Sequence, residues 1–310
     1  MDYNGKKMVV AIPCYNEEKT IKKVINDFKN ELPTAEIVIF DNNSTDNSAR
    51  IAKGEGAEVI DERRQGKGWV VKSIFEKIEA DIYILVDADD TYLAEDVHRL
   101  IEPVLDEEAD MAVGCRLCRA QDKAFRGLHI FGNYWLTFLL NKLFRANFKD
   151  ILSGYRVFSC NFVEHVPLIT GGFQTEAEMT IQAVEKNMRI LEVPIGYRPR
   201  PQGSLSKINT FRDGWLILLT MAMYMRDHNP LRFFLYLAIL WICGVELLFG
   251  VGLLGRLSSN EILITQMVIF LGALLLFVGG LVISAVNTRF KEFDITVRKL
   301  VRKDNSFNRR

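Results

Sequence analysis

The chain has 310 residues, which corresponds to two folding units at roughly 150 residues per domain. Lysine plus arginine and aspartate plus glutamate both number 39, so the formal net charge is zero. A neutral chain has no overall positive field to hold nucleic acid through its phosphates, and we expect no nucleic-acid partner. The 49% hydrophobic composition is unevenly distributed, because the last third of the sequence is far more apolar than the rest.

Short β-branched runs alternate with segments of helical periodicity over residues 1–114. The first helical segment carries apolar residues at helical spacing, namely Ile21, Val24, Ile25, Phe28 and Leu32. Strands are predicted at residues 8–12, 36–40, 57–60, 82–86 and 111–113. This alternation predicts an α/β fold with a mainly parallel sheet and helices on both faces. Ligands bind such sheets at the carboxyl ends of the strands.

Polar loops follow three of these strands, at residues 13–17, 41–46 and 87–91. Asp87 and Asp89 are two residues apart, so both carboxylates can share one divalent cation with the oxygens of a diphosphate. Hard oxygen ligands favour Mg²⁺ or Mn²⁺. Asp41 can accept hydrogen bonds from a base or ribose, and together these residues indicate a nucleotide diphosphate. The alternative for Asp87 and Asp89 is a solvated acidic turn.

Neither a dinucleotide-binding G-x-G-x-x-G fingerprint nor a Walker A loop is present. The glycine-rich loop at residues 65–68 precedes a predicted helix, which would bring backbone amides and Lys67 close to phosphate. Cys115 and Cys118 form a C-x-x-C without a second pair or a histidine cluster. We expect the five cysteines to be free thiols in a reducing compartment, with a metal or redox site as the alternative for this pair.

Two apolar segments, residues 129–146 and 211–226, have polar residues on one face or at the ends. Helices of this kind can lie in a membrane interface. For the first segment, a core helix packed on the sheet is an equally good interpretation.

Two longer apolar runs follow, residues 233–254 with the single charge Glu246 and residues 262–286 with none. Each exceeds the ~20 residues that cross a bilayer as a helix. The short linker, residues 255–261, predicts a transmembrane hairpin, and a buried pair of core helices is the alternative. The predicted domains are residues 1–210, 211–230, 231–288 and 289–310: a catalytic domain, an interfacial helix, the hairpin and a basic tail.

Lysine and arginine flank the hairpin on its outer sides, whereas the linker contains only Arg256. Because basic residues accumulate on the cytoplasmic side, both termini and the catalytic domain are expected to be cytosolic, in an integral protein of the cytoplasmic membrane. Residues 1–10 contain no signal-peptide core. Gly272, Gly279 and Gly280 would allow the hairpin to pack against a second copy, which suggests a homo-oligomer.

In combination and order, seven motifs resemble the family-two glycosyltransferases with the GT-A fold. They resemble most the polyprenyl-phosphate sugar transferases, the group that contains dolichyl-phosphate mannose synthase. The motifs are residues 12–18, the Asp41 loop, and residues 65–68, 87–89, 114–116, 150–156 and 206–207. The resemblance covers about residues 8 to 215.

This resemblance implies roles for individual residues. A base and ribose pocket would be formed by Pro13, Tyr15, Glu17 and Asp41; the diphosphate and metal site by Lys67, Asp87, Ala88 and Asp89, with Asp89 the principal metal ligand; and phosphate or acceptor contacts by Arg116, Arg156, Arg200 and Lys207. The spacing of Arg200 from Lys207 is one residue longer than the family's usual pattern. Thr91 stands where family members often supply a further metal ligand.

The chemistry of such a reaction needs negative charge stabilised on a departing diphosphate while positive charge develops at the anomeric carbon. A lipid phosphate nucleophile is largely ionised at neutral pH and hardly needs a general base. Asp150 is the candidate base or electrostatic partner of the sugar, or alternatively a loop cap. Glu176 and Glu178 resemble the family's acidic motif near the sugar, or alternatively form a solvated first helical turn. Single displacement predicts inversion.

The sequence therefore predicts a membrane-bound, metal-dependent inverting transferase. Its donor would be a nucleotide sugar, with UDP-glucose or UDP-N-acetylglucosamine ahead of GDP-mannose, and its acceptor undecaprenyl or dolichyl phosphate. A processive polysaccharide synthase is disfavoured, because no tryptophan follows an arginine as in its Q-x-x-R-W motif. A non-enzymatic membrane protein that binds sugar nucleotides is the remaining alternative.

Overall fold

The computed structural model describes residue 3 and residues 5–118, 127–201, 207, 209–253 and 259–307. Within these ranges, side chains are not described for residues 127–131, 210, 248–253, 259 and 291–307. The chain divides into two compact units, Met1–Met221 and Ala222–Arg310. The boundary between these units falls inside one helix, Thr210–His228, and the division predicted at 210/211 stays a prediction.

A seven-stranded sheet forms the centre of the first unit, in the order β3-β2-β1-β4-β6-β5-β7. Its strands are β1 (Met8–Cys14), β2 (Glu36–Asp41), β3 (Glu58–Asp61), β4 (Ile82–Leu85), β5 (Met111–Cys115), β6 (Arg156–Ser159) and β7 (Ile190–Pro194). Strands β3, β2, β1 and β4 are parallel neighbours. The five predicted strands and the mainly parallel α/β fold are therefore confirmed.

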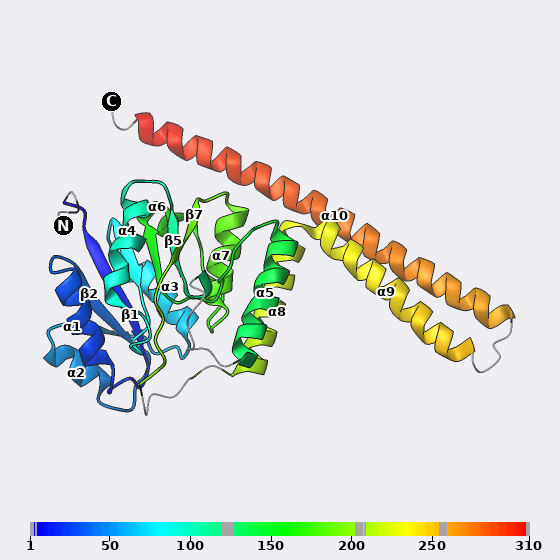
Figure 1. Ribbon diagram of the computed structural model, residues 1–310. Helices are drawn as coiled ribbons and strands as arrows, with labels where there is room; N and C mark the ends of the chain where they lie inside the picture. Colours follow the sequence, from blue (N-terminus) through cyan, green and yellow to red (C-terminus); the bar gives the residue numbers. More distant parts are fainter. Residues whose placement is uncertain are drawn as a thin grey trace. The chain divides into compact units, whose positions relative to one another are not determined.

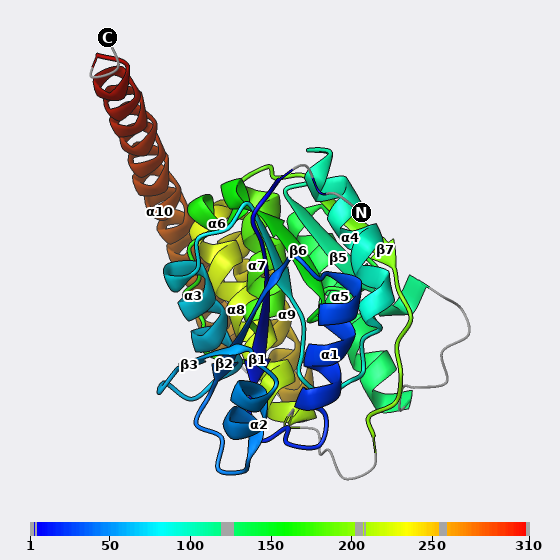
Figure 2. The same ribbon diagram turned by 90° about the vertical axis from the view of Figure 1, so that its left-hand side faces the viewer.

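The sheet is mixed because β6, which was not predicted, is antiparallel to both β4 and β5. It lies between β4 and β5, which follow each other among the predicted strands. Figure 2 shows β6 beside β5. Strand β7, also not predicted, pairs in parallel with β5 at the edge. Both are short, and β6 includes the fully buried Arg156, so a search for apolar runs does not find it.

Helices cover both faces of the sheet (Figure 1). One apolar cluster packs the sheet against α1 (Ile21–Glu31), α2 (Ser48–Gly54) and α4 (Val97–Leu105). The other packs it against α3 (Lys67–Lys77), α6 (Cys160–His165) and α7 (Thr175–Glu185). The remaining elements are the 3₁₀ turns η1 (Ala94–Asp96) and η2 (Arg116–Cys118) and the helices α5 (Gly127–Phe144) and α8 (Thr210–His228). The two predicted amphipathic segments are thus helical.

The start of α3 lies directly against the loop before α7. Gly66 has a φ of +135°, a conformation that side chains disfavour, and the Gly68 N–H donates to the Gly171 carbonyl at 3.1 Å. A Cβ at either glycine would clash with the backbone of residues 170–171. This close approach places Lys67 between β4 and α7.

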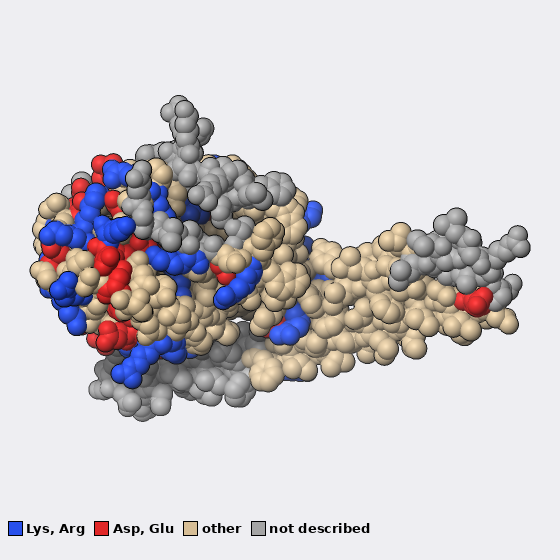
Figure 3. Space-filling view, turned by 90° about the horizontal axis from the view of Figure 1, so that it is seen from below, with Lys and Arg blue, Asp and Glu red and all other residues tan. Residues whose placement is uncertain are grey.

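The second unit contains α9 (Pro230–Leu253) and α10 (Ser259–Phe307). Both contain a stretch long and apolar enough to cross a membrane, Pro230–Leu247 and Asn260–Phe290. Charged side chains crowd the visible face of the first unit, whereas the described surface of these two helices is almost free of them (Figure 3). Of the predicted linker, residues 255–261, the part 255–258 lies outside the described residues. Helix α10 continues past the predicted boundary at residue 288.

Two of the three glycines that we expected to mediate self-association serve the α9–α10 pair instead. A Cβ at Gly272 would clash with the Trp241 side chain, and one at Gly280 would clash with Phe234. Only Gly279 of the three has open space around it. Oligomerisation therefore stays a prediction without the support of Gly272 and Gly280.

The contact between α3 and the loop before α7 predicts a strong effect of a single methyl group. Gly68→Ala should lower the melting temperature of the detergent-solubilised protein by several degrees and weaken nucleotide binding, because the loops must separate. Gly54→Ala is the matched control, since a Cβ there meets nothing within 4 Å. Thermal unfolding and titration with UDP measure both effects. Equal melting temperatures and equal UDP affinities of the two variants would contradict the importance of this contact.

Candidate active site

A cavity of about 560 Å³ lies at the carboxyl ends of β1 and β4. Most of the predicted site residues line it: Pro13, Tyr15, Glu17, Lys67, Asp87, Ala88, Asp89, Arg116, Glu176, Arg200 and Lys207. Four predicted residues do not line it, namely Asp41, Asp150, Arg156 and Glu178. Residues from distant parts of the sequence therefore meet where a parallel sheet binds ligands.

Lys67 is the most buried cation of the cavity. Its Nζ lies 2.5 Å from Asp87 Oδ1 and 2.7 Å from Glu176 Oε1. Burial alone would lower the pKa of Lys67, but the charges of Asp87 and Glu176 outweigh it and raise this pKa. Lys67 therefore remains an ammonium group and links the end of β4 to the first turn of α7.

Asp89 is buried at 4% exposure and has two kinds of partner. Its Oδ1 accepts hydrogen bonds from the Thr91 amide and hydroxyl, at 3.1 and 2.6 Å, and its Oδ2 lies 2.5 Å from Arg200 Nη2. Burial and the nearby charge of Asp87 raise the pKa of Asp89. Thr91, at the position of a further metal ligand in the family, thus orients Asp89 through its hydroxyl group.

Asp87 and Asp89 fit a site for a divalent cation that is bound by both carboxylates and by the oxygens of a diphosphate. Burial and the charge of Asp87 both raise the pKa of Asp89, and a cation bound by the two carboxylates would relieve this repulsion. In the described part of the chain, no cluster of three or more candidate ligands could enclose a metal ion. The remaining ligands would therefore be phosphate oxygens and water.

Arg200 and Lys207 converge on a buried carboxylate from the other side. Arg200 Nη1 lies 3.3 Å and Lys207 Nζ 2.5 Å from Glu17 Oε1. Lys207 also donates to the Asn16 carbonyl at 3.0 Å. Both cations thus face the strand-end carboxylates despite the unusual spacing between them. Ser206 of the same predicted motif lies outside the described residues.

Asp150 lies beneath Arg116 rather than in the cavity. It is 1% exposed and forms a bidentate ion pair with Arg116, whose Nε and Nη2 lie 2.8 and 2.9 Å from its two oxygens. Asn133 Nδ2 donates to the same carboxylate at 3.0 Å. Burial alone would raise the pKa of Asp150, but Arg116 and Asn133 lower it. This geometry fits a positioning group for Arg116 and does not fit a base that faces a sugar.

Arg156 does not reach an acceptor. It is fully buried, and its guanidinium donates to the Ser153 and Ile151 carbonyls and to the Thr180 hydroxyl, at 2.8–3.0 Å. Burial lowers the pKa of Arg156 to about 10. The expectation that it grips the acceptor was wrong, because all these contacts fasten the loop after Asp150 to α7.

Glu178 is a loop anchor. It is fully buried and accepts hydrogen bonds from the Ile169 and Thr170 amides at 2.8 and 2.9 Å. The prediction that Glu178 binds the sugar is therefore corrected, because its carboxylate faces the backbone of the loop before α7. Glu176, two residues earlier, remains a candidate because it lines the cavity and its Oε2 has no hydrogen-bond partner among the described residues.

Asp41 lies beside the cavity without lining it. Its Oδ2 accepts from the Ser44 amide at 3.1 Å, and its buried Oδ1 has no partner among the residues that the structure describes. Its neighbour Asn42 does line the cavity and fixes the loop before α3, accepting from the Gly66 amide at 2.7 Å. The unpartnered oxygen keeps Asp41 a candidate for binding a base.

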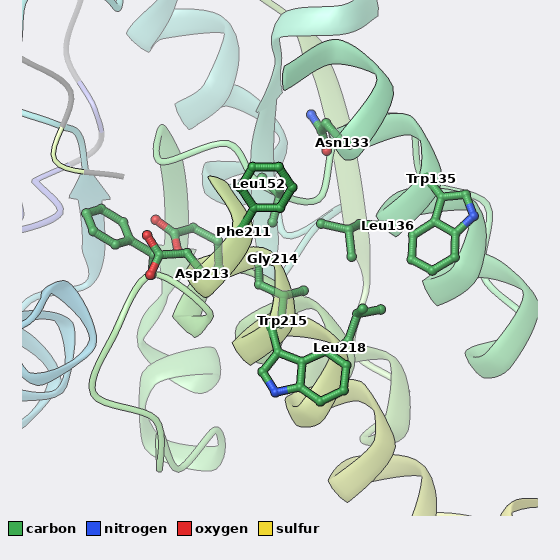
Figure 4. A pocket seen from close by; sticks show the side chains of 13 residues that line it. Asn133, Trp135, Leu136, Leu152, Phe211, Asp213, Gly214, Trp215 and Leu218 are labelled. Atoms are coloured by element: carbon green, nitrogen blue, oxygen red, sulfur yellow. The ribbon is translucent and has the colours of Figure 1, made fainter. Parts of the chain in front are cut away.

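A second cavity of about 470 Å³ was not predicted from the sequence. Its walls are mostly apolar and come from α5, α8 and the loops before β6 and α7; they include Leu136, Leu152, Phe173, Phe211, Trp215 and Leu218 (Figure 4). Phe211 and Trp215 are 85% and 62% exposed. The two apolar helices of the sequence analysis thus enclose a pocket in the first unit.

Cys115 and Cys118 form a disulfide, contrary to the expectation of free thiols. The 3₁₀ turn at the end of β5 brings their Cα atoms to 5.5 Å, which suits this bond. Arg116 lies between them. Cys14, Cys160 and Cys243 are free.

Residues 9–166 match the family model described as glycosyl transferase family 2. The chain belongs to this family. It is 33% identical over 226 residues to glycosyltransferase AglJ of Haloferax volcanii, covering 73% of this chain and 74% of the relative. It is 29% identical over 217 residues to a UDP-N-acetylglucosamine–dolichyl-phosphate N-acetylglucosaminyltransferase of Methanococcus voltae, covering 61% and 85% of the two chains.

The fold is that of GT-A glycosyltransferases. A crystal structure of glucosyl-3-phosphoglycerate synthase from Mycobacterium tuberculosis, with Mn²⁺, UDP and glucosyl-3-phosphoglycerate, superposes with a TM-score of 0.60. The two proteins are 22% identical, and the match covers 71% of this chain and 80% of that chain. The predicted family, fold and enzyme class are therefore confirmed.

The buried pair of Asp150 and Arg116 predicts a large stability effect. Asp150→Asn should lower the free energy of unfolding by about 3–5 kcal/mol at neutral pH, because it leaves a buried guanidinium unpaired. Since the folded-state pKa of Asp150 lies below its usual value, this difference should be complete above about pH 4 and shrink in stronger acid. Denaturant unfolding measures it, with the exposed Asp106→Asn as control. Equal stability of both variants would contradict the assignment.

Proposed function

We propose that this glycosyltransferase moves a sugar from a nucleotide diphosphate sugar to polyprenyl phosphate at a membrane surface. The observation that carries the proposal is the pair of adjoining cavities. One contains paired carboxylates and several cations, and the other is mostly apolar. They share Leu152, Phe173, Glu176 and Asp213 in their walls. A nucleotide sugar needs a polar site and a polyprenyl chain needs an apolar one, and the two sites must adjoin for the sugar to be transferred.

The donor would occupy the polar cavity. Pro13 and Tyr15 would contact the base and ribose, with Asp41 accepting from the base. A UDP-sugar is favoured because the relative from Methanococcus voltae is named for UDP-N-acetylglucosamine. UDP-glucose is the second candidate, and GDP-mannose is the alternative. The donor's diphosphate would lie near Asp87 and Asp89.

Cationic side chains would stabilise the leaving group. Arg200 and Lys207, which neutralise Asp89 and Glu17 in the structure, are close enough to exchange these partners for diphosphate oxygens. Mg²⁺ or Mn²⁺ held by Asp87 and Asp89 would supply further charge neutralisation when bound. Lys67 would keep Asp87 in place. A single displacement would invert the configuration at the anomeric carbon.

The acceptor phosphate would be held by Arg116, whose guanidinium is oriented by Asp150 and lies 5.3 Å from the centroid of the Tyr197 ring. Its first isoprene units would lie in the apolar cavity. The exposed Phe211 and Trp215 of α8 would then dip into the membrane interface, where aromatic side chains are favourable.

Helices α9 and α10 would anchor the enzyme as a transmembrane hairpin. Their apolar stretches have the required length, and lysine and arginine flank them on the sides that would be cytosolic. The catalytic domain would therefore face the cytosol, where sugar nucleotides are made. Association of hairpins from two copies is part of the proposal.

A transfer assay tests the function directly. Purified protein in detergent should move radiolabelled sugar from one member of a panel of UDP- and GDP-sugars to polyprenyl phosphate, in the presence of Mg²⁺ or Mn²⁺. A chelator and Asp89→Ala should each abolish the chloroform-extractable label, whereas the exposed Asp106→Ala should not. If no donor labels the lipid although the protein is folded and binds UDP, the acceptor assignment fails.

The apolar cavity predicts a second, separable effect. Gly214 lines this cavity, and a Cβ there meets nothing within 4 Å, so Gly214→Leu starts from an open position and should fill part of the cavity. The KM for polyprenyl phosphate should rise about tenfold while the KM for the donor stays unchanged. Gly54→Leu, at an open position remote from both cavities, is the control. An unchanged acceptor KM would place the lipid elsewhere.

A further inference from the structure

The two cavities adjoin at a wall of two apolar and two acidic residues, Leu152, Phe173, Glu176 and Asp213. If donor and acceptor occupy these cavities, the anomeric carbon and the attacking phosphate oxygen meet at this wall. In Figure 4 the Asp213 carboxylate lies at the end of the apolar cavity away from Trp135. The two carboxylates of this wall would therefore lie next to the transferred sugar.

Glu176, in the wall between the two cavities, has one carboxylate oxygen without a hydrogen-bond partner among the described residues. The residue is 4% exposed, its Oε1 pairs with Lys67 at 2.7 Å, and its Oε2 has no hydrogen-bond partner within the described ranges. A buried acceptor without a donor costs stability, which a ligand that donates a hydrogen bond would restore. Sugar hydroxyl groups are such donors, so this oxygen independently indicates a ligand at the wall.

Asp213 is the second carboxylate of the junction and comes from the first turn of α8. It is 7% exposed, and its Oδ2 accepts from the Asn209 amide at 2.8 Å. Among the described lysines and arginines, none forms an ion pair with its carboxylate within 4.0 Å. The N-terminal end of α8 stabilises this negative charge through its backbone dipoles.

A negative charge at this place would stabilise the transition state of the reaction. The bond between the anomeric carbon and the diphosphate oxygen breaks, and its electron pair leaves with that oxygen. A phosphate oxygen of the acceptor supplies the electron pair of the new bond. In between, positive charge develops on the anomeric carbon and ring oxygen. No proton needs to be removed, since a phosphate monoester is largely dianionic at neutral pH.

We infer that Asp213 is a catalytic residue that contacts the transferred sugar and stabilises the positive charge of its transition state. This role rests on the proposed function. It falls to Asp213 because Asp150, the carboxylate that the sequence pointed to, is occupied by Arg116 and Asn133. Glu176 on the same wall accepts a hydrogen bond from a sugar hydroxyl and is itself held by Lys67.

The test compares two aspartates of one helix. Asp213→Asn removes the charge but keeps an oxygen that can accept from the Asn209 amide, and Asp213→Ser is a second neutral variant if the first does not fold. Asp227→Asn is the matched control, because Asp227 lies on α8, is exposed and pairs only with its neighbour Arg226 among the ion pairs found. Sugar transfer to polyprenyl phosphate is measured at saturating and limiting donor, and UDP binding by calorimetry.

Asp213→Asn should lower kcat about a hundredfold, the order of magnitude for losing one electrostatic group that stabilises a transition state, with donor KM and UDP affinity within about threefold of wild type. A purely structural cap would instead change stability or KM. A kcat equal to that of Asp227→Asn overturns the role of Asp213. If wild-type protein transfers no sugar to polyprenyl phosphate, the proposed function fails, and the role of Asp213 falls with it.

Discussion

The site depends on one buried ammonium group held between two carboxylates. Lys67 reaches Asp87 at the end of β4 and Glu176 at the start of α7, so it connects the aspartate pair after β4 to the wall that the two cavities share. This position exists because glycines on both sides of Lys67 let the backbone touch the loop before α7. Any larger residue there would separate the two halves of the site.

A second buried ion pair, between Asp150 and Arg116, has a similar effect. Asp150 fixes Arg116 at the wall of the polar cavity and takes a further hydrogen bond from Asn133, which lines the apolar cavity. The buried pair therefore joins the walls of both cavities. Together with Lys67 it holds the walls of the polar and the apolar cavity, which share Glu176 and Asp213 and which we propose as the donor and acceptor sites.

The sequence predicted the parts of this arrangement that have a local signature. Apolar runs gave five strands, and the acidic loops that follow β1 and β4 indicated the polar cavity, which both aspartates line. Which groups a charged side chain contacts in the folded protein cannot be predicted from its neighbours in the sequence. Asp150, Arg156 and Glu178 all looked like site residues in their motifs, but tertiary contacts turn their charges toward Arg116 or toward buried backbone groups.

Features made by two distant segments were also beyond the sequence. Strand β6 became recognisable only between β4 and β5, and the apolar cavity needs α5 and α8 side by side. Asp213 could have been noticed as the acidic residue four positions after Asn209, at the start of an apolar helix. The pattern alone could not show that it lies in the wall shared by the two cavities.

Photo-crosslinking tests the central claim, that the lipid chain enters between α5 and α8 and meets the donor at their shared wall. A polyprenyl phosphate with a diazirine in its first isoprene unit would be irradiated on the full-length protein, and the labelled peptides sequenced. The account predicts label on α5 and α8, near Leu136 or Trp215, which is lost in Gly214→Leu. Label confined to α9 and α10 would contradict it.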